Sequence, residues 1–431
     1  MSMKLLDRDH SVFLRRINWQ LFLVLLVMVA CFFTWSENIN VTRAIKLVGR
    51  LGMLGASWSI YRRILNYGAA DNLNTKNPLS PALYAIYLLL GFVSFMWSTN
   101  IGYSALQWFM TAQTIFFCFF FIKSLFLLDQ YFPNHSIRLF NLIGNTAFVL
   151  VFIFVIGMYL LPNEFYRLTH GGEEARLGGY MMNPNELGML AGVGIAGLLF
   201  DLRRNHQKWA TIFKLIVLFY GLYETGSRSS LVGVFLIILF HLYQSEQKKI
   251  TLIAVVVLMI VAPFAIYKIV LKEGDPERME EVLTLTGRLP FWNALILEGL
   301  PREPLLGFGF MRIDYKEYFQ GKNTYPGKMT HNTFMQVLMN LGLIGLAIVL
   351  LQLMFTLMAI WREDPEKRLM LLSLMIPLLI NSFTEFGIFG ESNFGILYYQ
   401  IIIVYISLQP GKILTLKQKL HLVKTKRIEG I

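Results

Sequence analysis

The chain has 431 residues, of which 55% are hydrophobic and only 15% are charged. Soluble domains carry about 25% charged residues, so this composition excludes an ordinary water-soluble enzyme and indicates an integral membrane protein. The formal net charge of +12 does not indicate a nucleic-acid partner, because the cations lie between apolar runs of membrane-spanning length.

Twelve apolar segments are long enough for helices that cross a bilayer, which takes roughly 20 residues. In chain order they are residues 19–35, 44–61, 81–97, 105–127, 139–161, 185–200, 209–223, 229–243, 250–271, 333–360, 369–382 and 393–408. The first follows Arg15 and Arg16 and lacks a cleavage site, which predicts a retained signal anchor. Cys31 and Cys118 lie inside apolar segments, which excludes a disulfide framework. We predict an all-α, polytopic membrane protein with a single transmembrane domain over residues 1–431.

The second segment, residues 44–61, is the least certain helix because Lys46 and Arg50 interrupt it. A charge at the middle of the membrane costs about 2.5 to 3.5 kcal/mol on insertion scales. The alternative is a helix along the membrane interface. Without this segment every later connection would change sides, so the charge pattern of those connections decides between the two.

The connections between segments alternate in charge. Those on one side carry Arg62, Arg63, Lys76, Arg138, Arg203, Arg204, Lys208, Lys248, Lys249, Arg362, Lys367 and Arg368, and the tail after residue 408 is also basic. The short connections on the other side, ENIN, STNIGYS and TEFGIFGES, carry no Lys or Arg. Because cationic loops stay in the cytoplasm, both termini are predicted to be cytoplasmic and all twelve segments to span.

Two predicted external connections are long, residues 162–184 and residues 272–331. Long loops on a rigid scaffold often carry function, although a solvated linker is the plain alternative. The second of them also contains an amphipathic stretch, residues 291–300, that suits a helix at the membrane surface.

Two arginines stand at the predicted external boundary. Arg228 lies between Ser227 and Ser229, and Arg288 lies in the large loop shortly before Trp292. Arginine is well suited to phosphate, since its planar fork makes two parallel charge-assisted bonds, and small hydroxyl residues can join it. A structural alternative is that Arg228 reaches up to the lipid headgroups.

Further polar residues gather at the same predicted face. His331 and Asn332 begin the tenth segment, where a histidine can act as a general base, although a structural histidine is the more common case. Arg176 precedes Asn183 and Asn185, which can satisfy the free amides of the sixth segment; Arg176 itself is a candidate anion ligand. Glu385 and Glu391 are expected to be solvated and are weaker candidates for orienting a cation or a sugar.

The chain lacks the common nucleotide-phosphate and metal motifs, G-x-x-x-x-G-K-[ST], D-x-D and H-E-x-x-H. We therefore predict no metal and no cofactor. Arginines and a histidine that converge at an external boundary fit a donor that is itself a lipid carrying phosphate.

The chain resembles the superfamily of O-antigen ligases and polysaccharide polymerases, which are Wzy-like and WaaL-like membrane glycosyltransferases. The matching pieces are Ser-Arg-Ser at 227–229, Thr-Gly-Arg at 286–288 with Trp292, Pro-Leu-x-Gly-x-Gly at 304–309, and His331-Asn332 followed by Gly342-x-x-Gly345. Asn-Pro-Asn at 183–185 and Trp-Ser at 97–98 add support. Their order and their predicted side of the membrane agree with this superfamily.

The resemblance implies a GT-C-like enzyme of the bacterial inner membrane with a large periplasmic loop and a periplasmic active site. Arg228 and Arg288 would bind the diphosphate of an undecaprenyl-diphosphate-linked glycan, and His331 would be the general base of an inverting transfer. Arg176, Ser227, Ser229, Asn332 and Trp292 would contact substrate. The acceptor would be a second glycan or lipid A-core, and membrane lipids and a chain-length regulator protein are candidate partners.

The motifs do not separate the branches of this superfamily. Thr286-Gly-Arg288 and Asn183-Pro-Asn185 favour a polymerase of O-antigen or exopolysaccharide repeats over a ligase that attaches glycan to lipid A-core. A lipid-linked oligosaccharide transporter is a third hypothesis, although transporters place their sites near the membrane midplane and often show repeated halves. A structural subunit of an assembly complex would explain the helices but not the arginines and the histidine.

Overall fold

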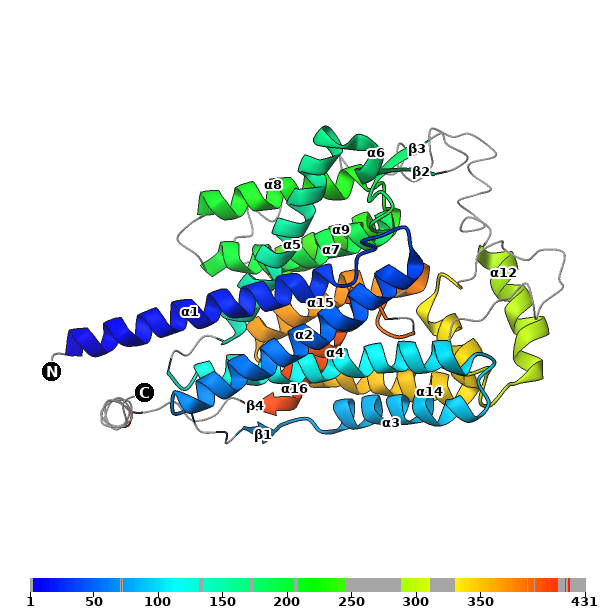
Figure 1. Ribbon diagram of the computed structural model, residues 1–431, viewed down its shortest axis with the longest axis horizontal. Coiled ribbons are helices and arrows are strands. Elements are labelled where there is room, and N and C mark those ends of the chain that lie inside the picture. The colour runs from blue at the N-terminus through cyan, green and yellow to red at the C-terminus, as the bar shows by residue number, and fades with distance from the viewer. Residues whose placement is uncertain are drawn as a thin grey trace.

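A computed structural model describes residues 3–69, 71, 73–131, 135–169, 174–204, 208–244, 288–310, 330–385, 387–390, 392–409, 415 and 418 (Figure 1). Seven helices in this part of the chain are long and apolar enough to cross a membrane. They are α1 (Met3–Ala30), α3 (Leu79–Val93) with its 3₁₀ extension η1 (Ser94–Met96), α4 (Ile101–Leu128), α5 (His135–Leu160), α7 (Pro184–Arg204), α14 (Thr333–Trp361) and α15 (Pro365–Thr384). The prediction of a mostly helical, multi-pass membrane protein is confirmed.

Four more helices complete the bundle within the described ranges. Two are short and apolar, α9 (Arg228–Tyr243) and α16 (Phe394–Ser407), and two are more polar, α2 (Ile39–Asn66) and α8 (Lys208–Glu224). A helix therefore stands at each predicted segment that falls on described residues. The ninth predicted segment, residues 250–271, lies outside them, so the number of twelve spans stays a prediction.

The helices lie side by side, and the bundle has two distinct ends (Figure 1). One end carries α12 (Arg288–Ala294) and the hairpin of β2 (Tyr166–Thr169) and β3 (Glu174–Leu177); we call it the α12 end. The other end carries the start of α1 and the strand pair of β1 (Asn74–Thr75) and β4 (Leu408–Gln409). The ion pair between Lys76 Nζ and Glu363 Oε1 also lies beside this strand pair. The positive-inside rule assigns the α12 end to the periplasm, and that assignment remains a prediction.

The short strands modify the predicted all-α class. β2 and β3 pair antiparallel, with Tyr166 opposite Leu177, inside the connection that was predicted as an irregular loop over residues 162–184. The helical turn α6 (Pro162–Phe165) leads into them. A hairpin gives backbone groups near the membrane surface hydrogen-bond partners within their own segment, and apolar periodicity does not reveal so short a pair.

The least certain helix lies within the bundle. α2 packs along α4, and Ser57 Oγ donates to the backbone oxygen of Phe117 at 3.4 Å. Arg50, which made this helix doubtful, is 1% exposed, and its Nη1 donates to Ser392 Oγ at 2.6 Å. The charge that argued against a spanning helix therefore faces protein rather than lipid.

The core is centred on α16. Every residue of this helix is buried, including Tyr398 and Tyr399, and it contacts α3, α4, α14 and α15. Gln400 Nε2 donates to Tyr84 Oη at 2.8 Å, so the amide nitrogen of this residue finds a partner on a neighbouring helix. A helix that is apolar on all sides is expected at the centre of a bundle.

The described part of the large loop lies across the α12 end of the bundle (Figure 1). α12 continues into a π-helical turn, η5 (Leu295–Gly299), and a 3₁₀ turn, η6 (Leu300–Arg302). Phe291 and Leu295 are 1% exposed and pack against Phe308 and Met339, whereas Leu297 is 66% exposed. The amphipathic helix predicted at residues 291–300 is therefore present, with one apolar face buried and another open.

The glycines of the loop motif and of α14 lie against each other. α14 breaks at Gly342, which has φ 64° and ψ −165°, and the 304–309 segment fills the break. The amides of Phe308 and Gly309 donate to the backbone oxygens of Met339 and Asn340 at 3.0 and 2.8 Å. The amide of Leu343 donates back to the oxygen of Pro304 at 2.8 Å. Gly342 thereby permits a broken helix whose freed backbone groups bind a loop.

Replacing Gly342 with alanine is expected to destabilise the protein by about 1–3 kcal/mol or more, because this backbone conformation is almost restricted to glycine. A Cβ at this position would also lie 2.3 Å from the carbonyl atoms of Leu305. The matched control is Gly52→Ala on α2, where a Cβ meets nothing within 4 Å and alanine favours the helix. Thermal unfolding in detergent micelles measures both; equal melting temperatures for the two variants would contradict the assignment.

The connection between α15 and α16 folds back into the bundle. Ile388 and Phe389 are fully buried, and the amide of Gly390 donates to Tyr87 Oη at 3.3 Å. We had predicted a short external loop here. Its apolar residues gain by leaving water, and side chains of α3 and α14 satisfy part of its backbone. Glu385, at the start of this connection, is consequently drawn below the surface.

Candidate active site

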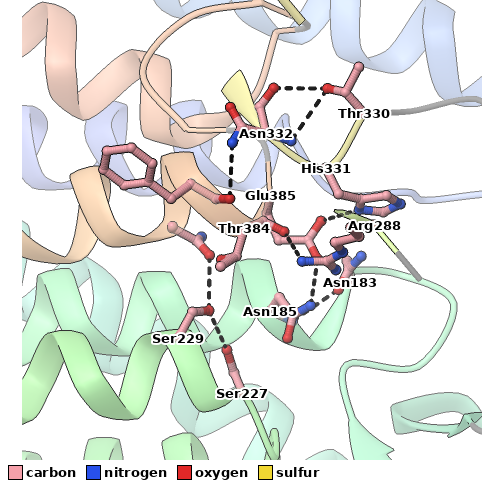
Figure 2. A network of polar contacts seen from close by, with 12 residues as sticks. Asn183, Asn185, Ser227, Ser229, Arg288, Thr330, His331, Asn332, Thr384 and Glu385 are labelled. Carbon is pink, nitrogen blue, oxygen red and sulfur yellow. Dashed lines mark hydrogen bonds and ion pairs between the residues drawn. The ribbon is translucent and has the colours of Figure 1, made fainter. Parts of the chain in front are cut away.

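A buried carboxylate is the centre of the polar cluster at the α12 end (Figure 2). Glu385 is 4% exposed. Its Oε1 accepts hydrogen bonds from Arg288 Nη2 at 2.8 Å and from Asn185 Nδ2 at 2.7 Å. Its Oε2 lies 2.7 Å from His331 Nδ1. Groups from four separate parts of the chain thus meet at one carboxylate.

Helix ends bring these groups together. Glu385 is the residue that ends α15, and its amide donates to the oxygen of Asn381 at 2.7 Å. Arg288 is the first residue of α12, and its Nη1 also donates to the backbone oxygen of Thr384. Asn185 lies in the first turn of α7, and its backbone amide donates to Asn183 Oδ1 at 2.9 Å. Asn183 therefore caps the helix as predicted, while Asn185 instead bridges to Glu385.

The environment of Glu385 favours its ionised form. Burial by itself would raise the pKa of this carboxyl. The hydrogen bond and charge of His331, followed by the charge of Arg288 and the Asn185 hydrogen bond, outweigh burial and hold the pKa below its ordinary value. An ionised Glu385 accepts the Nδ1 proton of His331, and in that tautomer Nε2 carries the lone pair that can take a proton.

His331 is held in an unusual backbone conformation. Its φ is 50°, the only positive φ of a non-glycine residue among the described residues. Trp292 Nε1 donates to the backbone oxygen of Thr330 at 2.6 Å, and Asn332 Oδ1 caps α14 by accepting from the amides of Phe334 and Met335. Residues held in sparsely populated conformations cluster at functional sites. Trp292 and Asn332, predicted to contact substrate, thus have polar groups that are already used to fix the turn around His331.

Arg176 extends the cluster toward the hairpin. Its Nη2 donates to Asn185 Oδ1 at 2.8 Å, and its Nε donates to the backbone oxygen of Thr225 at 2.7 Å. Arg176 thereby ties β3 to the turn between α8 and α9 and orients the amide that bonds Glu385. It is half-buried, so its guanidinium supports the site and adds positive charge to it.

The start of α9 forms one border of the cluster (Figure 2). Ser227 is fully buried, and its Oγ caps α9 by accepting from the amide of Ser230, so this side chain is used for the fold rather than for substrate. Ser229 Oγ lies 3.4 Å from Asn381 Oδ1 and is partly exposed. Arg228 is half-buried, and among the described residues it has neither a hydrogen bond nor an ion pair. Within the described part of the chain, Arg228 is therefore the arginine of this cluster whose guanidinium is left open to a ligand.

The structure corrects one expectation about charged residues. Glu385 was expected to be solvated, but it is buried and holds Arg288 and His331; Glu391 lies outside the described residues. Arg288 was expected to bind the diphosphate; two of its terminal nitrogens bond Thr384 and Glu385, its side chain is 15% exposed, and a direct contact with phosphate stays a prediction. The chain sequence shows no spacing that pairs residue 385 with residues 288 and 331, which is why the carboxylate was underrated.

The cluster can bind an anion and accept a proton. Three arginines, at 176, 228 and 288, lie in or beside this cluster, and Arg288 forms an ion pair with Glu385. A histidine whose Nδ1 is fixed by a carboxylate is the arrangement of a positioned general base. These are the properties that an acid–base transfer from a phosphorylated donor requires.

The fold and the cluster define a multi-pass membrane protein with a cluster of arginine, histidine and glutamate side chains at one end of its bundle. Residues 213–350 match the model of the Wzy_C family, which is described as O-antigen ligase. This match confirms the resemblance to the O-antigen ligase and polysaccharide polymerase superfamily and supports an activity of that type. It contains Arg228, Arg288 and His331 but neither Arg176 nor Glu385. A search of curated proteins found no match.

Proposed function

We propose that this protein transfers a glycan from an undecaprenyl-diphosphate-linked donor to an acceptor hydroxyl, without a metal and with inversion at the anomeric carbon. The observation that carries the proposal is the buried Glu385 between His331 and Arg288, because it supplies an oriented base beside positive charge. The site would lie at the periplasmic face of a bacterial inner membrane, with both termini in the cytoplasm.

Arg228 is proposed as the direct ligand of the diphosphate. Its open guanidinium can make two parallel bonds to phosphate oxygens, and Ser229 beside it offers a hydroxyl. Arg288 is bonded to Glu385 and contributes positive charge from that position. Its buried Nε has no hydrogen-bond partner among the described residues and can add a bond to the diphosphate. Charge that develops on the leaving diphosphate is stabilised by these fixed cations.

His331 is proposed as the base. Its Nε2 takes the proton of the acceptor hydroxyl while the acceptor oxygen forms a bond to the anomeric carbon. The bond from that carbon to the diphosphate oxygen breaks, and its electron pair leaves with undecaprenyl diphosphate. Glu385 holds the ring through Nδ1 and stabilises the imidazolium that results. The products are a glycosylated acceptor and free undecaprenyl diphosphate.

We propose a glycan polymerase, which joins repeat units of O-antigen or exopolysaccharide, and a chain-length regulator protein is then a candidate partner. This choice rests on Thr-Gly-Arg at 286–288 and Asn-Pro-Asn at 183–185. The second candidate is a ligase that uses lipid A-core as acceptor, because the matching family carries that description. The two candidates share the donor and the catalytic groups and differ in acceptor.

Incubating the purified full-length protein with an undecaprenyl-diphosphate glycan, with and without lipid A-core, separates the candidates. A polymerase lengthens the lipid-linked glycan without lipid A-core, and gel electrophoresis of the products shows a ladder. A ligase gives product only when lipid A-core is present. Absence of product with either acceptor, together with movement of the donor across a vesicle membrane, would replace the transferase proposal with a transporter.

A further inference from the structure

Three cationic side chains on α2, which we call the cation ladder, have no role in the proposed reaction. Arg43, Lys46 and Arg50 are spaced three and four residues apart, which places them on one face of the helix. α2 begins at the α12 end, and Arg50 lies about three turns inside it. Arg43 and Lys46 are half-buried and Arg50 is 1% exposed, so the ladder leads from the surface into the protein.

A continuous line of contacts joins the two ends of this ladder. The guanidinium carbon of Arg43 lies 5.8 Å from the ring centre of Tyr103, whose Oη accepts from Gln107 Nε2 at 3.0 Å. Gln107 Oε1 accepts from the amide of Ser392 at 3.1 Å. Ser392 Oγ in turn accepts from Arg50 Nη1 at 2.6 Å. α2, α4 and the connection before α16 therefore surround one polar strip.

The guanidinium of Arg50 has two nitrogens that make no hydrogen bond with any described residue. Its Nε and Nη2 are buried without a hydrogen-bond partner, and no described carboxylate forms an ion pair with it. The ring of Phe32 covers one face of the guanidinium at 3.8 Å. Nε and Nη2 form the edge of the guanidinium that makes two parallel bonds to a phosphate or a carboxylate. A buried charge that has no counterion among the described residues is costly, so this edge of the guanidinium favours the binding of an anion.

We propose that Arg43, Lys46 and Arg50, with Ser392, form a second anion site, which binds a phosphate group at the Nε and Nη2 edge of Arg50. Both nitrogens are closed to solvent, so a phosphate reaches this edge only when the side chains that cover it move aside. The ladder opens at the predicted membrane surface, where a lipid headgroup and a free phosphate can both supply this chemistry. The proposal does not depend on the transferase activity.

The test measures binding rather than turnover. Full-length protein in neutral detergent is titrated with phosphatidylglycerol, with phosphatidylcholine, and with inorganic phosphate, while its thermal unfolding is followed. We expect phosphatidylglycerol or inorganic phosphate to raise the melting temperature until the site saturates. The concentration needed should rise about tenfold in Arg50→Gln and by a smaller factor in Arg43→Gln. Arg43→Gln and Ser392→Ala keep the test valid if Arg50→Gln does not fold.

The matched control is Arg62→Gln, which removes a cation from the exposed far end of the same helix and should leave the titration unchanged. Saturation by phosphatidylglycerol alone identifies a lipid headgroup, and saturation by inorganic phosphate identifies a free phosphate; both support the site. An unchanged titration of Arg50→Gln would overturn it. The site is equally excluded if neither anion stabilises the protein and Glu391→Gln destabilises it as Arg50→Gln does, because Glu391 is then the counterion.

Discussion

Replacing His331 with alanine is expected to reduce glycan transfer by about 10²- to 10⁴-fold, which is the usual contribution of a general base. The His331 side chain is 16% exposed and contacts Glu385 through Nδ1. The substitution therefore removes the base, while the ion pair between Glu385 and Arg288 remains. Asn332 still caps α14 in this variant, and the fold should persist. Product formation from the lipid-linked glycan measures the effect.

The variant His331→Gly tests whether the imidazole of His331 has a chemical role or a structural one. The φ of 50° suits glycine better than any other residue, so His331→Gly should fold at least as well as His331→Ala. The space left beside Glu385 is the shape of an imidazole ring. Added imidazole should therefore restore part of the transfer in His331→Gly and none in Glu385→Ala. A structural histidine would show no rescue.

A second histidine provides the matched control. His241 lies on α9 and is buried, and its Nε2 lies 2.9 Å from Ser373 Oγ. His241→Gln removes a buried imidazole from the last turn of α9, at the opposite end of that helix from Arg228. Transfer by this variant should stay close to that of the unmodified protein. Full transfer in His331→Ala would rule out the proposed base.

Helix positions could be predicted closely because apolar length alone decides where a chain can cross a bilayer. The predicted segment 333–360 became α14 (Thr333–Trp361), and the segment 139–161 became α5 (His135–Leu160). The ends of the helices were harder to predict. α1 ends at Ala30 although apolar residues continue to Trp35, because the chain there turns and the amide of Thr34 donates to the backbone oxygen of Met181 at 2.8 Å. The break in α14 was also missed, since a glycine within an apolar run has no local signature.

The candidate site could be predicted only in part, for a physical reason. Arg228, Arg288 and His331 stood out because a cation or an imidazole at a predicted external boundary is unusual in itself. Glu385 did not stand out, since an acidic residue in an external connection is ordinary until its burial is known. Its importance comes from contacts with residues 97 and 54 positions away, and no local spacing encodes such contacts.

Removing the Glu385 carboxylate is expected to affect both stability and transfer. Glu385→Ala leaves Arg288 as a buried cation without its partner, and breaking such a pair costs about 3–5 kcal/mol. Glu385→Gln keeps the shape and one acceptor oxygen, so it should be the more stable variant. Both should lower transfer by about a hundredfold, because His331 loses the charge that orients its ring and stabilises its protonated form.

The pH dependence of this effect follows from the lowered pKa of Glu385. A carboxyl whose pKa is lower in the folded than in the unfolded protein stabilises the fold fully above its ordinary value of about 4.3. That stabilisation is lost as the pH falls through the lowered pKa, where the folded carboxyl takes up its proton. The difference in unfolding free energy between the unmodified protein and Glu385→Gln should therefore shrink as the pH falls below about 4.

The matched control for this experiment is Glu298→Gln, which removes a carboxylate from the exposed side of η5. Its unfolding free energy should match that of the unmodified protein at every pH, because an exposed carboxylate gains little from folding. Unfolding in micelles at a series of pH values measures all three proteins. If the gap for Glu385→Gln were unchanged below pH 4, the ion pair with Arg288 and His331 would not be what stabilises this end of the bundle. The proposed active site would then have to be reassigned to residues around Arg228.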